Sequence, residues 1–275
     1  MASASSRIEG RVYLGSDWLL YADPDLSFDW SECVAPSLLF GSTSRTPTVL
    51  QRGGAAVTAP VMLHAAGVWS SMPSRTALAL LYVDPLSVDG AALQWRAADE
   101  IAAWQVLELL ARHGLSLATL CAGDVAADEV RDAVSALRAE MLAACAAHGA
   151  PEIDPRLLAL RSWLHERAEG RADPAAVGAR LGLSAEHVRK HFRQHVGMTL
   201  SSYQAWVRLY RMTADACAGG HDGQSPNVLS VIMAAGFFDA SHASRTVRRY
   251  LDLLPSEMVL PRAFVDCRGP GTTGG

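Results

Sequence analysis

Two stretches of the sequence carry polar and basic side chains three or four residues apart, a spacing that places each set on one face of a helix. The first polar face comprises Glu186, Arg189, Lys190 and Arg193, and the second polar face comprises Ser241, Arg245 and Arg248. Arginine and lysine donate to guanine edges and phosphates, and glutamate can accept from cytosine. A solvated helix surface is the simpler alternative for either set taken alone. Because the pattern occurs twice, we predict that both faces bind double-stranded DNA.

The side-chain chemistry suggests a role for each member of the two polar faces. We expect base contacts from Arg189, Lys190 and Arg245, added selectivity from Glu186 and Ser241, and phosphate contacts from Arg193 and Arg248.

A histidine stripe overlaps the first polar face. His187, His191 and His195 recur every fourth residue, and histidine pairs at that spacing can hold zinc or nickel. No cysteine or carboxylate is obviously placed to complete a metal site. Packing and phosphate contact are therefore the favoured roles, and we predict no bound metal.

The remaining reactive residues form no familiar catalytic pattern. Asp23, Asp25, Asp29 and Glu32 lack the spacing and central glycine of a calcium loop, which favours a solvated turn. Nucleophile elbows, phosphate-binding loops and zinc-protease motifs are absent from the sequence. Cys33 follows Glu32, and the neighbouring negative charge should raise the pKa of its thiol. We therefore expect neither an enzyme nor a cofactor.

The two polar faces must be held by helices that the capping signals delimit. One helix is predicted to start at Asp173-Pro174 and to end at Gly182. The next is predicted to start at Ser184 and to end at Gly197, so that a three-residue turn joins the two helices. A similar pair of helices is predicted to begin at Ser225-Pro226. Its first helix ends at Gly236, and Asp239 caps its second helix. This repeated pattern predicts two helix-turn-helix modules. Residues 200–218 between them read as one helix, roughly 28 Å long.

The order and spacing of these segments resemble the DNA-binding domain of AraC/XylS-type transcriptional regulators. The matching residues are Leu181-Gly182-Leu183-Ser184, Phe192-Arg193, Gly197-Met198-Thr199, Tyr203, Arg208-Leu209, Gly236-Phe237, Ser241-His242, Ser244-Arg245 and Leu254-Pro255-Ser256-Glu257. The resemblance covers about residues 155–260. It implies a sequence-specific transcriptional regulator that binds promoter DNA as a homodimer, with RNA polymerase as a further partner.

Some positions depart from the family pattern. Gly178 and Ile232 stand where a small alanine is usual, and Ala243 and Val247 replace aromatic residues. Residues 219–227 are longer than the usual connection and rich in glycine and polar residues, which predicts a mobile loop. We therefore expect the first module to carry most of the DNA affinity and the second to be the site of regulation.

The N-terminal half has a different pattern. Short apolar runs from residue 12 to 84 are separated by turn signals such as Asp23-Pro24-Asp25 and Met72-Pro73-Ser74, which predicts a β-domain. Residues 59–64 and 77–85 resemble a cupin-like barrel. The predicted fold is therefore α+β, with an N-terminal cupin-like β-barrel and following helices, and a C-terminal all-α domain of two helix-turn-helix modules joined by a linker helix. Its segments are a β-domain at 1–98, a helical dimerisation or linker segment at 99–150, the DNA-binding domain at 151–262 and a flexible tail at 263–275.

A stripe of apolar residues within 99–150 has two interpretations. Val130, Val134, Leu137, Met141 and Cys145 recur at helical spacing. They could form the seam of a homodimer, or they could pack on the chain's own β-domain, and two heptads are too few to decide.

The β-domain also contains the residues that could bind a small-molecule effector. Trp18, Trp30 and Trp69 could line a cavity, with His64 and Arg75 as its polar groups, although the aromatic residues could equally fill the barrel. His64 is the only histidine before His113, which excludes a three-histidine metal centre in the barrel.

Charge and composition are consistent with these assignments. The chain has 275 residues and a net charge of −4, but residues 1–150 hold 9 basic and 16 acidic residues whereas residues 151–275 hold 15 and 12. The basic charge thus lies with the two polar faces. Five cysteines without a close pair, no apolar leader and no long apolar run predict a soluble protein of the cytoplasm, near the nucleoid, without membrane contact. The modest basic charge leaves an alternative, a protein-binding adaptor or anti-regulator with weakened DNA contacts.

Overall fold

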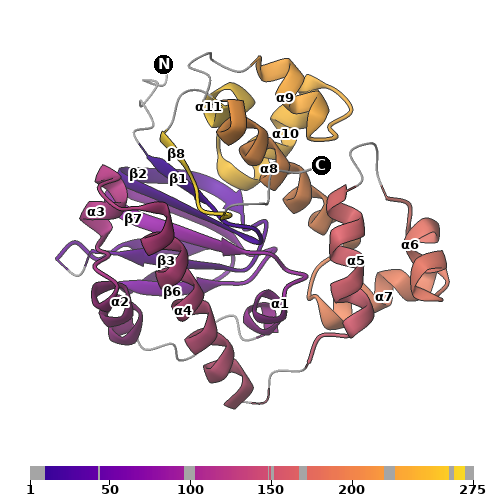
Figure 1. Ribbon diagram of the computed structural model, residues 1–275, viewed down its shortest axis with the longest axis horizontal. Coiled ribbons are helices and arrows are strands. Elements are labelled where there is room, and N and C mark those ends of the chain that lie inside the picture. Colours follow the sequence, from indigo (N-terminus) through magenta and orange to yellow (C-terminus); the bar gives the residue numbers. More distant parts are fainter. Residues whose placement is uncertain are drawn as a thin grey trace.

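A computed structural model describes residues 10–42, 44–95, 103–147, 149, 152–166, 172–219, 227–259 and 263–269. It has the predicted α+β architecture, with a β-sheet domain formed by the N-terminal part and a helical region formed by the C-terminal part (Figure 1). No helix in this described part is long and apolar enough to cross a membrane.

The N-terminal domain is built on one sheet of eight strands. Hydrogen bonding gives the order β5-β4-β7-β2-β1-β8, and β3 pairs with β6 and β7. The first seven strands are β1 (Arg11–Leu14), β2 (Trp18–Glu32), β3 (Ser37–Gly41), β4 (Thr48–Gln51), β5 (Ala56–Thr58), β6 (Val61–His64) and β7 (Trp69–Val83). The long strands β2 and β7 pair along most of their length and form the centre of the sheet.

Two segments predicted as turns lie inside these long strands, so that part of the prediction is wrong. Pro24 falls where the pairing shifts between Asp23 and Leu26. Pro73 falls in the shift between the pairs Leu26–Thr76 and Phe28–Met72. A proline has no backbone donor and is tolerated where the ladder is interrupted, so the chain bends at each bulge without reversing.

The two faces of the sheet have different neighbours. Leu20, Leu81 and Val83 belong to a core that also contains residues of four helices. These helices are α1 (Val88–Trp95), α2 (Ala103–Arg112), α3 (Leu117–Ala122) and α4 (Ala127–Ala147). Tyr21 and Leu80 alternate with the first set and point to the opposite face, which the C-terminal helices cover (Figure 1).

The apolar stripe of α4 packs against its own domain. Each of its five residues is 3% exposed or less within the single chain, and all five join the core of strands and helices described above. Of the two sequence interpretations, packing on the β-domain is therefore the one found, and this stripe is covered before any second copy is added.

The C-terminal helices follow the predicted boundaries closely. They are α5 (Pro155–Glu166), α6 (Pro174–Leu181), α7 (Ala185–His195), α8 (Leu200–Gly219), α9 (Val228–Ala234), α10 (Ala240–Leu251) and α11 (Pro255–Val259). Asp173, Ser184 and Asp239 cap the helices as predicted. The side chain of Asn227 caps α9, whereas the predicted start at Ser225-Pro226 and most of the predicted loop lie outside the described residues.

The segment predicted as a flexible tail instead adds a strand to the sheet. Residues of β8 (Ala263–Asp266) pair in parallel with β1, and the Cys267 backbone nitrogen donates to the Leu14 carbonyl at 2.8 Å. Cys267 is 1% exposed. The run Ala-Phe-Val lies between Arg262 and Asp266. Because three residues with polar neighbours give only a weak β-propensity, no strand was predicted here from the sequence.

Candidate DNA-binding surface and interdomain cavity

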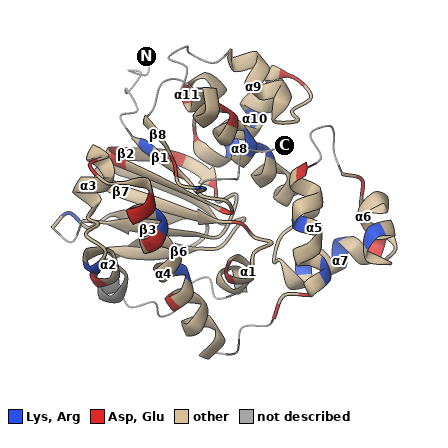
Figure 2. Cartoon of the chain, viewed as in Figure 1, with Lys and Arg blue, Asp and Glu red and all other residues tan. Residues whose placement is uncertain are grey.

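The first polar face lies on α7 and is open to solvent. Val188 and Phe192, on the inner side of α7, are completely buried, while all four members of the polar face are exposed. Ser184 caps the helix and Gly182 adopts a φ of 68°, which turns the chain between α6 and α7. Figure 2 shows the positions of basic residues, coloured blue, on the ribbons of both helices. The four residues are thus exposed on one helix, and their contact with DNA stays a prediction.

Gly178 explains one departure from the family pattern. A Cβ atom at this position would lie 2.3 Å from the Leu183 carbonyl oxygen, inside the turn of the first module. Glycine therefore allows α6 to approach the turn more closely than alanine would.

The histidine stripe of α7 makes contacts within the protein. His191 Nε2 lies 2.9 Å from a carboxylate oxygen of Asp154, and His187 Nδ1 lies 2.9 Å from the Ser184 hydroxyl. Hydrogen bonds from Arg156, with a smaller one from His191, hold the pKa of Asp154 well below its usual range. Within the described residues no group of three or more potential ligands could hold a metal. His191 thus connects α7 to the segment that precedes α5.

The second polar face lies on α10 and begins after a rigid turn. Gly236 has a φ of 84°, and its carbonyl accepts a hydrogen bond from Arg208 Nε at 3.0 Å. Ser241, Arg245 and Arg248 are exposed, as predicted. Ala243 and Val247, which stand where the family usually has aromatic residues, are both fully buried.

Phe238 is a surface feature that the sequence analysis missed. It is 84% exposed, whereas the preceding Phe237 is 2% exposed, and the next residue, Asp239, caps α10. The first residues of a recognition helix contact base edges, and apolar side chains can contact the thymine methyl group. The signal available in the sequence was a second phenylalanine between the buried position and the cap.

The end of α10 is docked on the β-domain. Arg249 Nη2 lies 2.6 Å from a carboxylate oxygen of Glu32, and the Asp29 backbone nitrogen donates to Asp252 at 2.9 Å. Glu32 is 7% exposed and Asp23 is 4% exposed, and both lie within strand β2, so the predicted solvated turn is wrong for these two residues. The second module is therefore tied to the sheet next to its polar face.

Trp69 takes part in this docking, and neither Trp69 nor Trp30 is among the residues that line the interdomain cavity described below. The guanidinium of Arg52 lies 4.6 Å from the Trp69 ring centre and 5.6 Å from that of Trp30, and Arg249 lies 5.9 Å from Trp69. These are cation–π distances. Trp18 is 3% exposed and belongs to the core between the sheet and the helices, so it too lies away from the cavity.

A cavity of about 810 Å³ lies between the β-domain and the C-terminal helices. His64 and Arg75 line it as predicted, together with residues of β2 and β7. On the other side it is lined by residues of α8, α10, α11 and β8, including Trp206, Tyr210 and Arg248. A molecule bound here would touch the sheet, the linker helix α8 and the C-terminal end of α10 at once.

Cys33 also lines this cavity. Burial raises the pKa of its thiol to about 11, with a smaller contribution from the charge of Glu32. The predicted direction is confirmed, although burial is the larger cause. The five cysteines are all free thiols.

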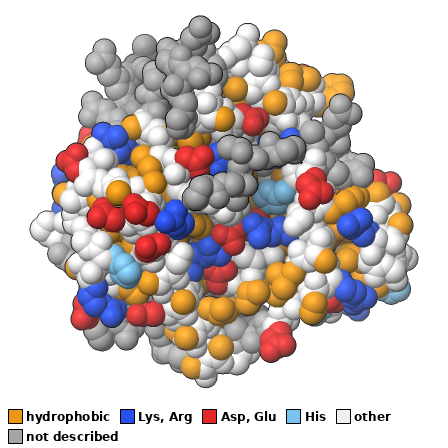
Figure 3. All heavy atoms as spheres, in the orientation of Figure 1, with side chains coloured by type: hydrophobic (Ala, Val, Ile, Leu, Met, Phe, Trp, Pro, Cys, Tyr) orange, Lys and Arg blue, Asp and Glu red, His pale blue; other side chains and the backbone are white. Residues whose placement is uncertain are grey.

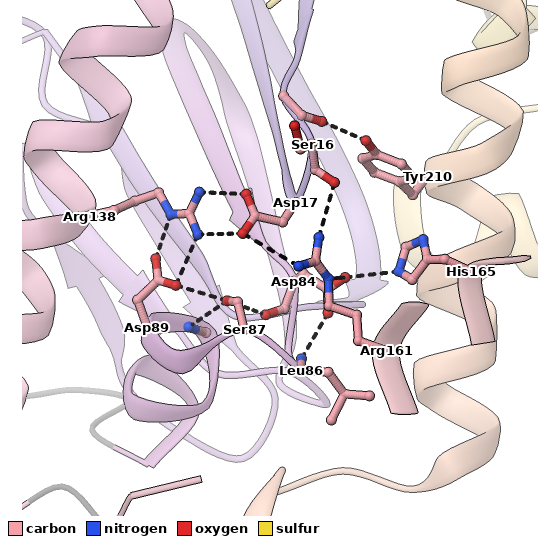
Figure 4. Close-up of polar contacts among 12 residues, drawn as sticks. Ser16, Asp17, Asp84, Leu86, Ser87, Asp89, Arg138, Arg161, His165 and Tyr210 are labelled. Carbon is pink, nitrogen blue, oxygen red and sulfur yellow. Dashed lines mark hydrogen bonds and ion pairs between the residues drawn. The ribbon is translucent and has the colours of Figure 1, made fainter. Parts of the chain in front are cut away.

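A separate ionic junction joins the two domains. Asp84 is completely buried, and its Oδ2 lies 2.9 Å from His165 Nε2 and 3.2 Å from Arg161 Nε, both on α5 (Figure 4). The hydroxyl of Tyr203 on α8 lies 3.4 Å from the same oxygen. Burial alone would raise the pKa of Asp84, but the hydrogen bond and charge of His165 and the charge of Arg161 outweigh it and lower the pKa.

Arg138 extends this junction within the β-domain. It forms a bidentate pair with Asp17 at 2.6 and 2.8 Å and also contacts Asp89. The surface view shows charged side chains gathered near the middle of this face (Figure 3). This network could not be identified from the sequence, because its members are scattered from residue 17 to 203.

Comparisons with known proteins agree with this arrangement. Residues 177–259 match a family described as a helix-turn-helix domain. No curated protein sequence matches the chain.

Among solved structures, an apo single-residue variant of ToxT from Vibrio cholerae strain SCE256 has a TM-score of 0.56 and 10% identity, covering 90% of this chain and 98% of its own. Wild-type ToxT from the same strain with bound unsaturated fatty acid has a TM-score of 0.54 and 11% identity, covering 90% and 96%. The AraC-like transcriptional activator CuxR, at 14% identity, has a TM-score of 0.36 and covers 79% and 80%. At these identities the likeness to ToxT concerns the fold.

Proposed function

We propose that this chain is an AraC/XylS-type DNA-binding transcription regulator, in which a ligand in the interdomain cavity controls how the two modules bind promoter DNA. The observation that carries the proposal is the position of the second module. Residues of α8 and α10 line the cavity, and α10 also carries the second polar face, of which Arg248 lines the cavity while Ser241 and Arg245 are exposed outside it. A ligand can therefore change the module without touching DNA.

The DNA contacts that we propose are those of the two polar faces. Arg189, Lys190 and Arg245 are exposed on α7 and α10, without a carboxylate partner among the described residues, so their guanidinium and ammonium groups are available to bases. The 20-residue helix α8 separates the modules by roughly 30 Å, comparable with one turn of DNA. Phe238 adds an apolar contact at the start of α10.

The proposed control uses differential binding to two arrangements of the second module. In the arrangement described here, Glu32 holds Arg249 and the α10 helix stays against the sheet. A ligand that binds one arrangement more tightly than the other shifts their populations by its difference in affinity. The fatty acid bound to ToxT supports a small-molecule effector by analogy of fold.

We also propose a homodimer that acts in the cytoplasm at the nucleoid, and contact with RNA polymerase, on the basis of the family resemblance. Because the α4 stripe is covered within one chain, the second copy must bind another surface. The division into segments 1–98, 99–150 and 151–262 remains our proposal.

The test of DNA recognition begins with selection of bound sequences from a random DNA library by the full chain. Arg189→Ala and Arg245→Ala should each weaken binding to the selected site by about 1 to 3 kcal/mol and relax its sequence preference. Arg193→Ala should weaken all sequences alike, since it removes a phosphate contact. Gel-shift titrations measure both effects, and Arg112→Ala on the β-domain is the control.

The same titrations separate a regulator from a protein-binding adaptor. DNA binding that uses several phosphates should weaken steeply as salt rises, because counterions are released. Unchanged affinity in both Arg189→Ala and Arg245→Ala, or a shallow dependence on salt, would favour the adaptor.

A further inference from the structure

Two residues that line the interdomain cavity each have a buried polar atom without a hydrogen-bond partner among the described residues. His64 and Trp206 are 4% and 2% exposed, and both line the cavity. Within the described residues, neither His64 Nε2 nor Trp206 Nε1 has a hydrogen-bond partner. A buried polar atom without a partner is destabilising, so such atoms mark a place where a bound molecule that supplies a hydrogen bond would be stabilised.

These two atoms define the deep end of the cavity. His64 pairs in register with Ser37, Ser37 with Tyr82, and Tyr82 with Leu19, so these residues form one row across the sheet. The ring centres of Tyr82 and Trp206 lie 6.5 Å apart, which places Trp206 beside that row. Burial lowers the pKa of His64 to about 4, so the imidazole is neutral near pH 7. The deep end thus offers neutral hydrogen-bonding groups.

The opposite end of the cavity is acidic. Asp23 lies four residues beyond Leu19 on the same strand, roughly 13 Å away along β2. The cavity lining contains five carboxylates, from Asp23, Asp25, Asp29, Asp252 and Glu257, and two guanidinium groups, from Arg75 and Arg248. Arg75 is already paired with Asp25 at 2.8 Å, so the net charge of this lining is negative.

Apolar side chains also line the cavity. Leu80, Leu209, Met258 and Phe264 line the cavity between the sheet and the C-terminal helices. The cavity therefore suits an elongated molecule with an apolar body and different groups at its two ends.

We propose that the cavity binds an amphipathic amine, with its ammonium group at the Asp23 end and a hydroxyl or carbonyl oxygen at the His64–Trp206 end. The Trp206 indole would donate to that oxygen, and the carboxylates would balance the ammonium charge. A fatty-acid anion fits neither end well, because the deep end holds no cation and the other end carries an excess of negative charge. This inference names the effector class of the proposed regulator and rests on that function only for its effect on DNA.

Two probes of equal chain length test the charge preference. Isothermal titration calorimetry of the full chain at pH 7 should show 10-aminodecan-1-ol binding at least ten-fold more tightly than 10-hydroxydecanoate. Asp23→Asn should weaken the aminoalcohol about ten-fold, since it keeps the side-chain shape and removes the charge. The matched control is Asp132→Asn, an exposed carboxylate on α4 outside the cavity, which should change neither affinity.

The deep contact has its own test. Trp206→Phe keeps an aromatic ring and removes the N–H donor, so it should weaken 10-aminodecan-1-ol several-fold while leaving decylamine, which has no oxygen, nearly unchanged. If that variant does not fold, the exposed Asp252→Asn should still reduce the preference for the amine.

Three results would overturn the assignment of an amine. The first is that 10-hydroxydecanoate binds as tightly as 10-aminodecan-1-ol or more tightly. The second is that 10-hydroxydecanoate binds and that Arg248→Ala abolishes its binding. The third is that none of the probes binds. DNA binding is measured separately by gel shift. Amine binding without any effect on DNA would reject effector control and leave the ligand class standing, whereas DNA binding without amine binding would reject the ligand class alone.

Discussion

At the scale of single residues, side-chain types decide what this protein can contact. The polar faces of α7 and α10 could be predicted from the sequence because helical spacing and capping residues are local signals. The two partnerless atoms of the cavity could not be predicted. His64 was identified as a polar group, but Trp206 reads as one more apolar position of α8, and the absence of a partner among the described residues depends on how α8 packs against the sheet.

Asp84 illustrates how much one buried carboxylate can contribute. Asp84→Asn leaves Arg161 and His165 without their counter-charge, and we expect it to destabilise the protein by about 3 kcal/mol. That is the low end of the range for removing one partner of a buried ion pair, because Arg161 is part exposed and keeps a contact with Asp17 at 4.0 Å. Urea unfolding at pH 7 measures the loss.

The pH dependence of stability gives an independent check of the same residue. The pKa of Asp84 is lowered in the folded protein, so its contribution is fully present above the unfolded value of about 4 and is lost as pH falls through the folded value. Asp84→Asn should therefore flatten the loss of stability below about pH 4. A profile as steep as that of the unchanged protein would contradict this role.

At the scale of elements, the positions of helices were predicted better than the course of strands. Helix limits depend on nearby caps such as Asp173 and Asp239, whereas a strand continues or ends according to its neighbours in the sheet. Pro24 and Pro73 therefore looked like turns, although each occupies a bulge between two long paired strands. The same long-range dependence hid β8, whose partner β1 lies at the other end of the chain.

The docking of α10 on β2 leads to a prediction about DNA affinity. Glu32→Gln weakens the contact with Arg249, which we expect to contribute about 1 kcal/mol because the arginine is half exposed. If docking restrains the second module, DNA affinity should rise about five-fold. Fluorescence anisotropy with the selected site measures this change.

The control for this experiment is Glu140→Gln. It breaks an exposed pair with Arg112 within the β-domain, at 3.3 Å, and should leave DNA affinity unchanged. A fall in affinity for Glu32→Gln, or an equal change in both variants, would argue against restraint by α10 docking.

At the scale of the whole molecule, the two domains share cores, a cavity and an ionic junction. Leu14 of β1 and Tyr203 of α8 belong to the same buried cluster, and the Tyr210 hydroxyl donates to the Gly15 carbonyl at 2.6 Å. The sequence indicated two domains with different charge but carried no signal for their relative placement. That placement depends on contacts between residues far apart in the chain.

Deletion of residues 263–275 tests the contribution of β8. The deletion removes the parallel partner of β1 and the buried Cys267, and should destabilise the protein by about 2 to 5 kcal/mol. Thermal unfolding measures the effect. Deletion of residues 270–275 alone is the control, because it leaves β8 and Cys267 in place and should cost much less.

The return of the chain to β1 also determines how the DNA-binding domain can move. The domain is connected to the sheet by the segment before α5 and again by β8, so its helices remain at high effective concentration beside the sheet even when the contacts of α10 break. Separation of α10 is then a small, intramolecular displacement that reverses readily. Occupancy of DNA should follow effector concentration without a slow step of domain reassembly.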